Sequence, residues 1–96
     1  MYANFLLGSL RVTEAAKIKL KRIPLDLIAR HAVNDHGNIT AREAKLNALA
    51  LKRTGTIMSR YFIDPTDPKQ GSVAVITHET WGDTVVQLED EPEDDQ

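Results

Sequence analysis

The sequence of 96 residues contains no cysteine, and it has only one tryptophan, two tyrosines and two phenylalanines. Without cysteine the protein has no disulfide, no thiolate nucleophile and no cysteine-based zinc or iron–sulfur site, which agrees with a reducing cytoplasm. No apolar run approaches the ~18 residues that a membrane span requires. The first residues carry no basic charge before a short apolar stretch, so we expect no signal peptide and a cytoplasmic location.

Motifs of the familiar enzyme classes are also missing. None of the serines Ser9, Ser59 and Ser72 lies in a Gly-x-Ser-x-Gly elbow. The five glycines are scattered, and Gly55 is not followed by the Lys and Ser/Thr of a phosphate-binding loop. These absences favour a protein that is not an enzyme and needs no cofactor.

Charge is unevenly distributed along the chain. Residues 1–60 contain eleven Lys/Arg and four Asp/Glu, a net charge of +7, whereas residues 61–96 contain one Lys and ten Asp/Glu, a net charge of −9. Because ~100–200 residues usually form one domain, we predict a single α+β domain over residues 1–88. The last eight residues, 89–96, are strongly acidic and contain no apolar residue, so we expect them to form a disordered tail.

Two helices are predicted in the first third of the chain. The first follows Thr13 as its cap and ends near Arg22, because Pro24 disfavours helical geometry at the residue before it. The second opens with Pro24, at the position where a missing N–H costs least. It ends at residues 34–38, where Asn and Gly tolerate the left-handed conformation that closes helices.

A third helix is predicted from Thr40 to the stop at Gly55. Thr40 and Glu43 form a capping box, in which the Thr hydroxyl and the Glu carboxylate each accept from a backbone N–H of the first turn. The residues that line one face of this helix are Leu46, Leu49, Ala50 and Arg53.

Strands are predicted where β-branched and aromatic residues concentrate, at residues 2–12, 56–63, 73–78 and 84–88. The last three are close in sequence and form an antiparallel meander. The first strand joins at an edge or in the middle of the sheet. The fold class is therefore α+β, with two layers and an antiparallel sheet of three to four strands packed against about three helices.

The residues with metal-binding or acid–base potential are His31, Asp35 and His36. On a helix, His31 and Asp35 are one turn apart and share a face, so an imidazole oriented by a carboxylate can act as a base or bind a metal. The alternative, which we favour, is that His31 makes a hydrogen bond at the helix C-terminus and the other two are turn residues.

A basic string offers a nucleic-acid contact, through Lys17, Lys19, Lys21 and Arg22. Such a patch would bind mostly by neutralising phosphates, because no side chain suited to reading bases is presented on a groove-sized element. We favour the alternative of a solvated helix face, with Ile18 and Leu20 of the same helix packed inward.

Protein contact is expected at the turn between the last two predicted strands and at the acidic end of the chain. An exposed Trp81 at a hairpin tip would anchor a partner, although a hairpin Trp more often folds back over the sheet edge. The acids Glu89, Asp90 and Glu91 add a charged contact surface. An open edge of the meander could also pair with a second copy to form a homodimer.

Several motifs distributed over residues 7–90 form a recognisable pattern. They are Leu7-Gly8 and Thr13; Pro24, Leu25, Leu27, Arg30 and His31; Asp35 and Gly37; Asn47, Ala50, Leu51 and Lys52; Gly55, Ser59 and Tyr61; Val75-Ile76-Thr77; and Thr84, Val86 and Leu88. In this pattern the chain resembles a family of small, uncharacterised bacterial proteins labelled "plasmid-related protein", from which it departs by having Asn34 and His36 where the family has Gly and Trp. The resemblance implies a home on a plasmid or another mobile element, but no established activity.

The leading interpretation is thus a small, non-enzymatic accessory module of a mobile element that acts by protein–protein contact, in one version on host machinery that handles nucleic acid. Nucleic-acid binding by the basic string and a small metal-dependent or His-based enzyme remain as alternatives.

Overall fold

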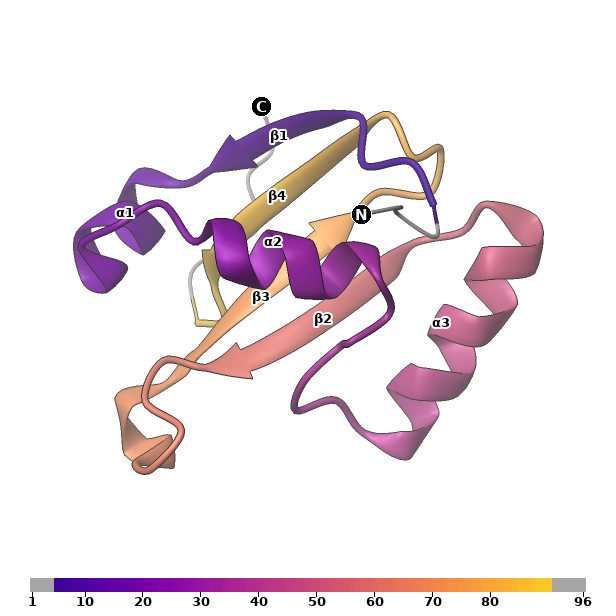
Figure 1. Cartoon of the computed structure of the whole chain (residues 1–96). Helices are drawn as coiled ribbons and strands as arrows, with labels where there is room; N and C mark the ends of the chain where they lie inside the picture. The colour runs from indigo at the N-terminus through magenta and orange to yellow at the C-terminus, as the bar shows by residue number, and fades with distance from the viewer. Residues whose placement is uncertain (1–4, 91–96) are drawn as a thin grey trace.

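The computed structural model describes residues 5–90 as a four-stranded mixed sheet with three α-helices, an α+β fold as predicted (Figure 1). In chain order the elements are β1 (Ser9–Val12), α1 (Glu14–Leu20), α2 (Leu25–Ala32), α3 (Ala41–Arg53), β2 (Ile57–Phe62), a 3-10 turn (Pro68–Gln70), β3 (Ser72–Thr77) and β4 (Asp83–Leu88). Among residues 5–90, no helix is both long and apolar enough to cross a membrane.

The strands lie in the order β1-β4-β3-β2, and the predicted antiparallel meander of β2, β3 and β4 is confirmed. The expectation of a fully antiparallel sheet is wrong, because β1 pairs with β4 in parallel at the edge. Three helices and two strands intervene between them, so no tight turn forces the antiparallel direction. Of the strand predicted over residues 2–12, residues 2–4 lie outside the described residues, and β1 begins only after Gly8, which has φ +66° and lies against the backbone of Gly82, where a Cβ would not fit.

The helix ends follow the capping signals in the sequence. The Thr13 hydroxyl accepts from the Ala16 N–H at the start of α1, and Lys21 closes that helix in the left-handed conformation. At α3 both halves of the capping box are present: the Thr40 hydroxyl accepts from the Glu43 N–H (3.1 Å) and the Glu43 carboxylate accepts from the Thr40 N–H (2.8 Å).

Helix α2 lies across one face of the sheet, and α3 runs alongside the β2 edge (Figure 1). The main core joins α2 to the three strands of the meander, through Leu27, Ile28, Tyr61, Val73, Val75 and Val86. A second apolar cluster, of Phe5, Ala50 and Ile57, lies where the last turns of α3 meet the beginning of β2. Together these clusters fix both helices to the sheet and leave the outer side of α3 facing solvent.

Candidate functional site

His31 is fully buried beneath α2, where both of its ring nitrogens are hydrogen-bonded. Its Nδ1 lies 2.6 Å from the Ser59 hydroxyl of β2, and its Nε2 lies 2.9 Å from the Thr77 hydroxyl of β3. The favoured prediction was that His31 makes a hydrogen bond, but its partners are side chains of the sheet rather than groups at the helix end.

These hydrogen bonds belong to a row of hydrogen bonds that ends at the Leu7 carbonyl, and that end fixes which group donates in each of them. The Thr84 hydroxyl donates to the Leu7 carbonyl (2.7 Å), so it accepts from the Thr77 hydroxyl, 2.7 Å away. Thr77 therefore accepts from Nε2–H of His31. A neutral His31 then has its lone pair on Nδ1 and accepts from the Ser59 hydroxyl.

His36 is half-buried and forms the other end of this hydrogen-bonded chain. Its Nδ1 lies 2.6 Å from the Ser59 hydroxyl oxygen, and because the Ser59 proton points to His31, His36 must be the donor. Burial lowers the pKa of His31 to about 3, with a smaller contribution from nearby His36, and burial also lowers the pKa of His36. Both rings are therefore neutral at pH 7, each in a single tautomer.

This polar chain is suited to holding the sheet and α2 together rather than to chemistry. Its central members, His31, Ser59, Thr77 and Thr84, are 0% exposed, so no substrate reaches them. The chain also ends on a backbone carbonyl, which is too weak a base to receive a proton at neutral pH. Its members satisfy one another, which is what a buried polar network requires.

Asp35 does not join His31, contrary to the alternative of a metal or acid–base cluster. Because α2 ends at Ala32, Asp35 lies beyond the helix and binds Arg30 through two hydrogen bonds of 2.7 and 3.1 Å. The Arg30 guanidinium lowers the pKa of Asp35 and also lies 4.6 Å above the Tyr61 ring. No group of three or more His, Asp or Glu side chains that could hold a metal occurs among residues 5–90.

The basic string of α1 is only partly available for a nucleic acid. Arg22 pairs with Asp26 at 2.5 Å, and Lys17 lies 3.7 Å from Glu14. Lys19 and Lys21 are exposed, but Lys19 lies on a helix of only seven residues, and Lys21 is the cap residue that follows it. The predicted inward packing holds for Leu20 and is wrong for Ile18, which is 69% exposed.

Trp81 does not project freely from the hairpin as an exposed anchor would; it folds back, the alternative that is more common for a hairpin Trp. Its indole N–H donates to the Gly55 carbonyl (2.8 Å), and its ring lies 5.7 Å from Phe5. Of the acids predicted to contact a partner, Glu89 pairs with Arg60, Asp90 is exposed, and Glu91 lies outside the described residues.

The outer edge of β2 is closed to strand addition by residues that precede it. The Asn47 amide of α3 bonds both backbone groups of Met58, at 2.8 and 3.0 Å. Two residues further along β2, the Arg60 N–H donates to the His36 carbonyl (3.0 Å) and the Arg60 carbonyl accepts from the Asn38 N–H (2.6 Å). The homodimer that we considered therefore cannot form by pairing along this stretch of the meander.

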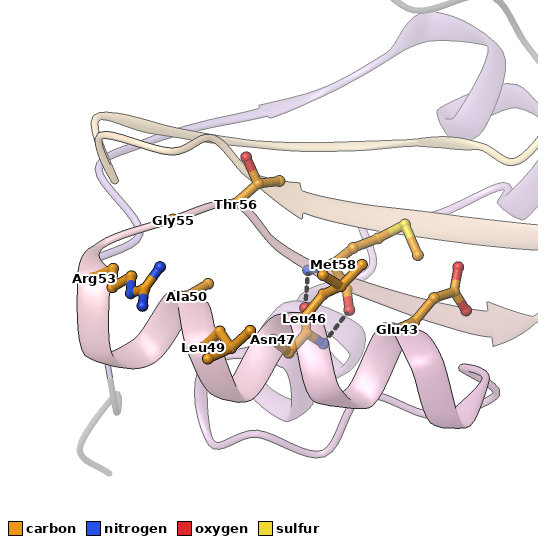
Figure 2. A pocket seen from close by; sticks show the side chains of 9 residues that line it. All are labelled: Glu43, Leu46, Asn47, Leu49, Ala50, Arg53, Gly55, Thr56 and Met58. Carbon is orange, nitrogen blue, oxygen red and sulfur yellow. Dashed lines mark hydrogen bonds between the residues drawn. The ribbon is translucent and has the colours of Figure 1, made fainter.

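A groove of about 520 Å³ lies between α3 and the beginning of β2, and the sequence did not reveal it (Figure 2). The residues that line it are Glu43, Leu46, Asn47, Leu49, Ala50, Arg53, Gly55, Thr56 and Met58. Of the residues expected on one face of α3, only Ala50 is buried, whereas Leu46 is 53% and Leu49 48% exposed. The groove therefore has apolar walls that are open to solvent.

Two arginines frame these leucines on α3. Arg42, Leu46, Leu49 and Arg53 are spaced by four, three and four residues, so they form one stripe along the helix. All four are exposed, and no ion pair of either arginine is found among residues 5–90. The sequence alone could have indicated this stripe, because the spacing of these two leucines and two arginines can be read from the third predicted helix.

The one acid among the described residues of the groove wall is already neutralised. The Arg60 guanidinium donates to both carboxylate oxygens of Glu43, at 2.7 and 2.8 Å, and also to Glu89. These hydrogen bonds from Arg60, with the cap bond from Thr40, lower the pKa of Glu43 to about 2. Among the described residues that line the groove, Arg53 is therefore the one charged side chain without an ion pair, beside apolar walls.

Neither a family model, nor a curated protein, nor a solved structure matches this chain.

Proposed function

We propose that the protein is a non-enzymatic binding module whose groove beside α3 takes the apolar side chains of an acidic protein segment. The observation that carries the proposal is the pair Leu46 and Leu49, about half exposed at the border of a 520 Å³ groove. Single exposed apolar residues are ordinary on protein surfaces, but two that line one concave surface are typical of a binding site.

The apolar wall supplies the binding energy in this proposal. Covering one large apolar side chain is worth ~1.5–3 kcal/mol. Because Leu46 and Leu49 are only about half exposed and Met58 less, a partner that covers them would gain roughly half that amount from each leucine and a smaller part from Met58, from which the costs of association are subtracted. Affinities in the micromolar range are typical of helix and peptide grooves of this modest size, because only a few side chains are buried.

The charge of the border selects the partner. Arg53 lines the groove, Arg42 lies on the same stripe of α3 one turn before Leu46, and Glu43 is held by Arg60. Lys45 and Lys52 lie further round the same helix. Acidic side chains next to the apolar anchors would therefore be attracted, and basic ones repelled. Because these charges are exposed, salt would slow association more than it weakens the final contact.

Selection from a library of random displayed peptides tests this proposal without assuming a sequence. We expect the folded protein to enrich peptides that combine apolar anchors with Asp or Glu. The variant Leu49→Asp should lose these peptides, because it places a charge in the apolar wall without burying it.

The matched control is Leu25→Asp. Leu25 is 66% exposed on α2, away from the groove, so this variant introduces the same charge elsewhere. It should retain the selected peptides. Failure to enrich any peptide, enrichment of basic peptides, or equal losses in the two variants would each overturn the proposal.

A further inference from the structure

We infer that the segment bound in this groove is an α-helix whose acids match Arg42 and Arg53 and whose apolar residues match Leu46 and Leu49. The inference rests on the proposed function and specifies the conformation of its partner. Two observations carry it: the closed edge of β2 beside the groove, and the helical spacing of the four exposed side chains.

The closed edge disfavours an extended partner. A peptide strand that adds to a sheet depends on the alternating N–H and C=O groups of the edge. At Met58, which lines the groove, both of these groups are taken by the Asn47 amide, and the backbone groups of Arg60 are taken by residues 36 and 38. A bound segment would thus have to satisfy its own backbone hydrogen bonds, as a helix does.

The spacing on α3 gives the pattern expected on the partner. Arg53 lies eleven positions after Arg42, a distance of ~16 Å along a helix at 1.5 Å per residue. A second helix packed along this stripe would place one acid opposite each arginine and two apolar residues between them. The expected pattern is therefore acid, apolar, apolar and acid, at spacings of four, three and four residues.

The electrostatic environment favours acids at both ends of that pattern. The carboxylate of Glu43, the residue after Arg42 in the sequence, is paired with Arg60, and no ion pair of Arg42 is found among residues 5–90. At the other end, Arg53 itself lines the groove. Each end of the stripe can thus form an interhelical ion pair, of the kind that sets partner choice in coiled coils.

Three synthetic peptides of identical composition test the inference. The first has the 4-3-4 pattern and a proline at its end. The second has the same end proline but places the leucines and acids at alternate positions. The third keeps the 4-3-4 pattern but has the proline at its centre, where it breaks a helix. Measured by fluorescence anisotropy, the first should bind roughly tenfold or more tightly than either of the others, since each loses at least one buried side chain.

Charge exchange provides a control that depends on position. Arg53→Glu should weaken binding of the first peptide several-fold. A peptide with Lys in place of the acid that faces position 53 should bind Arg53→Glu well and the original protein more weakly. Lys52→Glu changes the charge equally on the same helix, off the stripe, and should not show this exchange.

The outcomes separate the two proposals. If library peptides are selected through Leu49 but show no 4-3-4 pattern, or if the alternating peptide binds as well as the first, the helix is overturned while the binding module stands. If the library gives no peptide and none of the three synthetic peptides binds, both are overturned. Tighter binding of the first peptide with charge exchange at Arg53 supports both.

Discussion

The Nδ1 atom of His31 lies 2.6 Å from the Ser59 hydroxyl, although 28 positions separate the two residues in the sequence. This bond, with the one from His31 to Thr77, joins α2 to two adjacent strands. His31, Ser59, Thr77 and Thr84 are also among the residues on which the resemblance to the plasmid-related family depends. The resemblance itself stays a prediction, but its motifs meet in space as one hydrogen-bonded unit.

Removing one hydroxyl from this unit should be costly. Thr77→Val keeps the shape of the side chain but leaves the Nε2–H of His31 without an acceptor and the Thr84 hydroxyl without a donor. Leaving buried groups unpaired costs ~1–3 kcal/mol each, so we expect the free energy of unfolding, measured in urea, to fall by about that amount or more. Thr80→Val, on the exposed β3–β4 turn, should change it by less than ~0.5 kcal/mol. Equal effects of the two variants would contradict the network.

Acid should destabilise the protein before its carboxylates titrate. In the unfolded chain His31 binds a proton below its ordinary pKa of 6.5, whereas burial in the folded protein lowers that pKa to about 3. Between these values the unfolded state holds more protons, so the free energy of unfolding falls as the pH falls, by up to ~1.4 kcal/mol per pH unit. His36 contributes in the same direction, because burial lowers its pKa as well.

The variant His31→Gln separates this titration from packing. A glutamine amide can accept from Ser59 and donate to Thr77, but it does not titrate. We therefore expect the slope of unfolding free energy against pH, from urea denaturation between pH 6.5 and 4.5, to flatten in His31→Gln. Below pH 4.5 the loss should steepen in both proteins, because Glu43 keeps a pKa of about 2 only while it is bound to Arg60. An unchanged slope above pH 4.5 would contradict the assignment of His31.

Much of the fold was accessible from local sequence signals. The capping box of Thr40 and Glu43 and the β-branched and aromatic residues of the last three strands are signals within a few residues of sequence, and the elements that they predict are confirmed. The direction of β1 was not accessible, because its partner β4 lies some seventy residues away and no turn geometry links them. Non-local pairing of this kind depends on how the whole chain packs.

The candidate site was less accessible, for two physical reasons. The one-turn spacing of His31 and Asp35 places them on one face only while the helix continues, and α2 ends between them. On α3 the spacing of apolar residues shows which side chains share a face of the helix, but not whether another part of the protein packs on that face. Because α3 lies beside the edge of the sheet rather than on its face, Asn47 and Ala50 occupy the inner positions, and Leu46 and Leu49 remain exposed.

Asn47 should protect the protein from association as well as stabilise it. Asn47→Ala removes both hydrogen bonds to the Met58 backbone and reopens that part of the β2 edge. We expect a loss of ~1–3 kcal/mol in unfolding free energy, together with concentration-dependent self-association in sedimentation velocity. Lys45→Ala, on the exposed side of the same helix, should show neither change. A variant Asn47→Ala that stays monomeric at high concentration would show that this edge needs no protection.

Gly37, in the loop after α2, forms an isolated β-bridge with Arg60 of β2, and it should tolerate no side chain. It has φ +69°, and a Cβ there would lie 2.3 Å from the Arg60 carbonyl oxygen and 2.5 Å from the Tyr61 ring. Gly37→Ala therefore has an unfavourable backbone conformation and also pushes the loop away from β2. We expect it to lower the free energy of unfolding, measured in urea, by ~2 kcal/mol or more. Gly82→Ala is the matched change, since its Cβ would meet only the Thr80 hydroxyl at 3.4 Å. It should cost less than ~1 kcal/mol. If Gly37→Ala were as stable as Gly82→Ala, the loop would not be held against β2, and the closed edge on which the helical partner depends would have to be reconsidered.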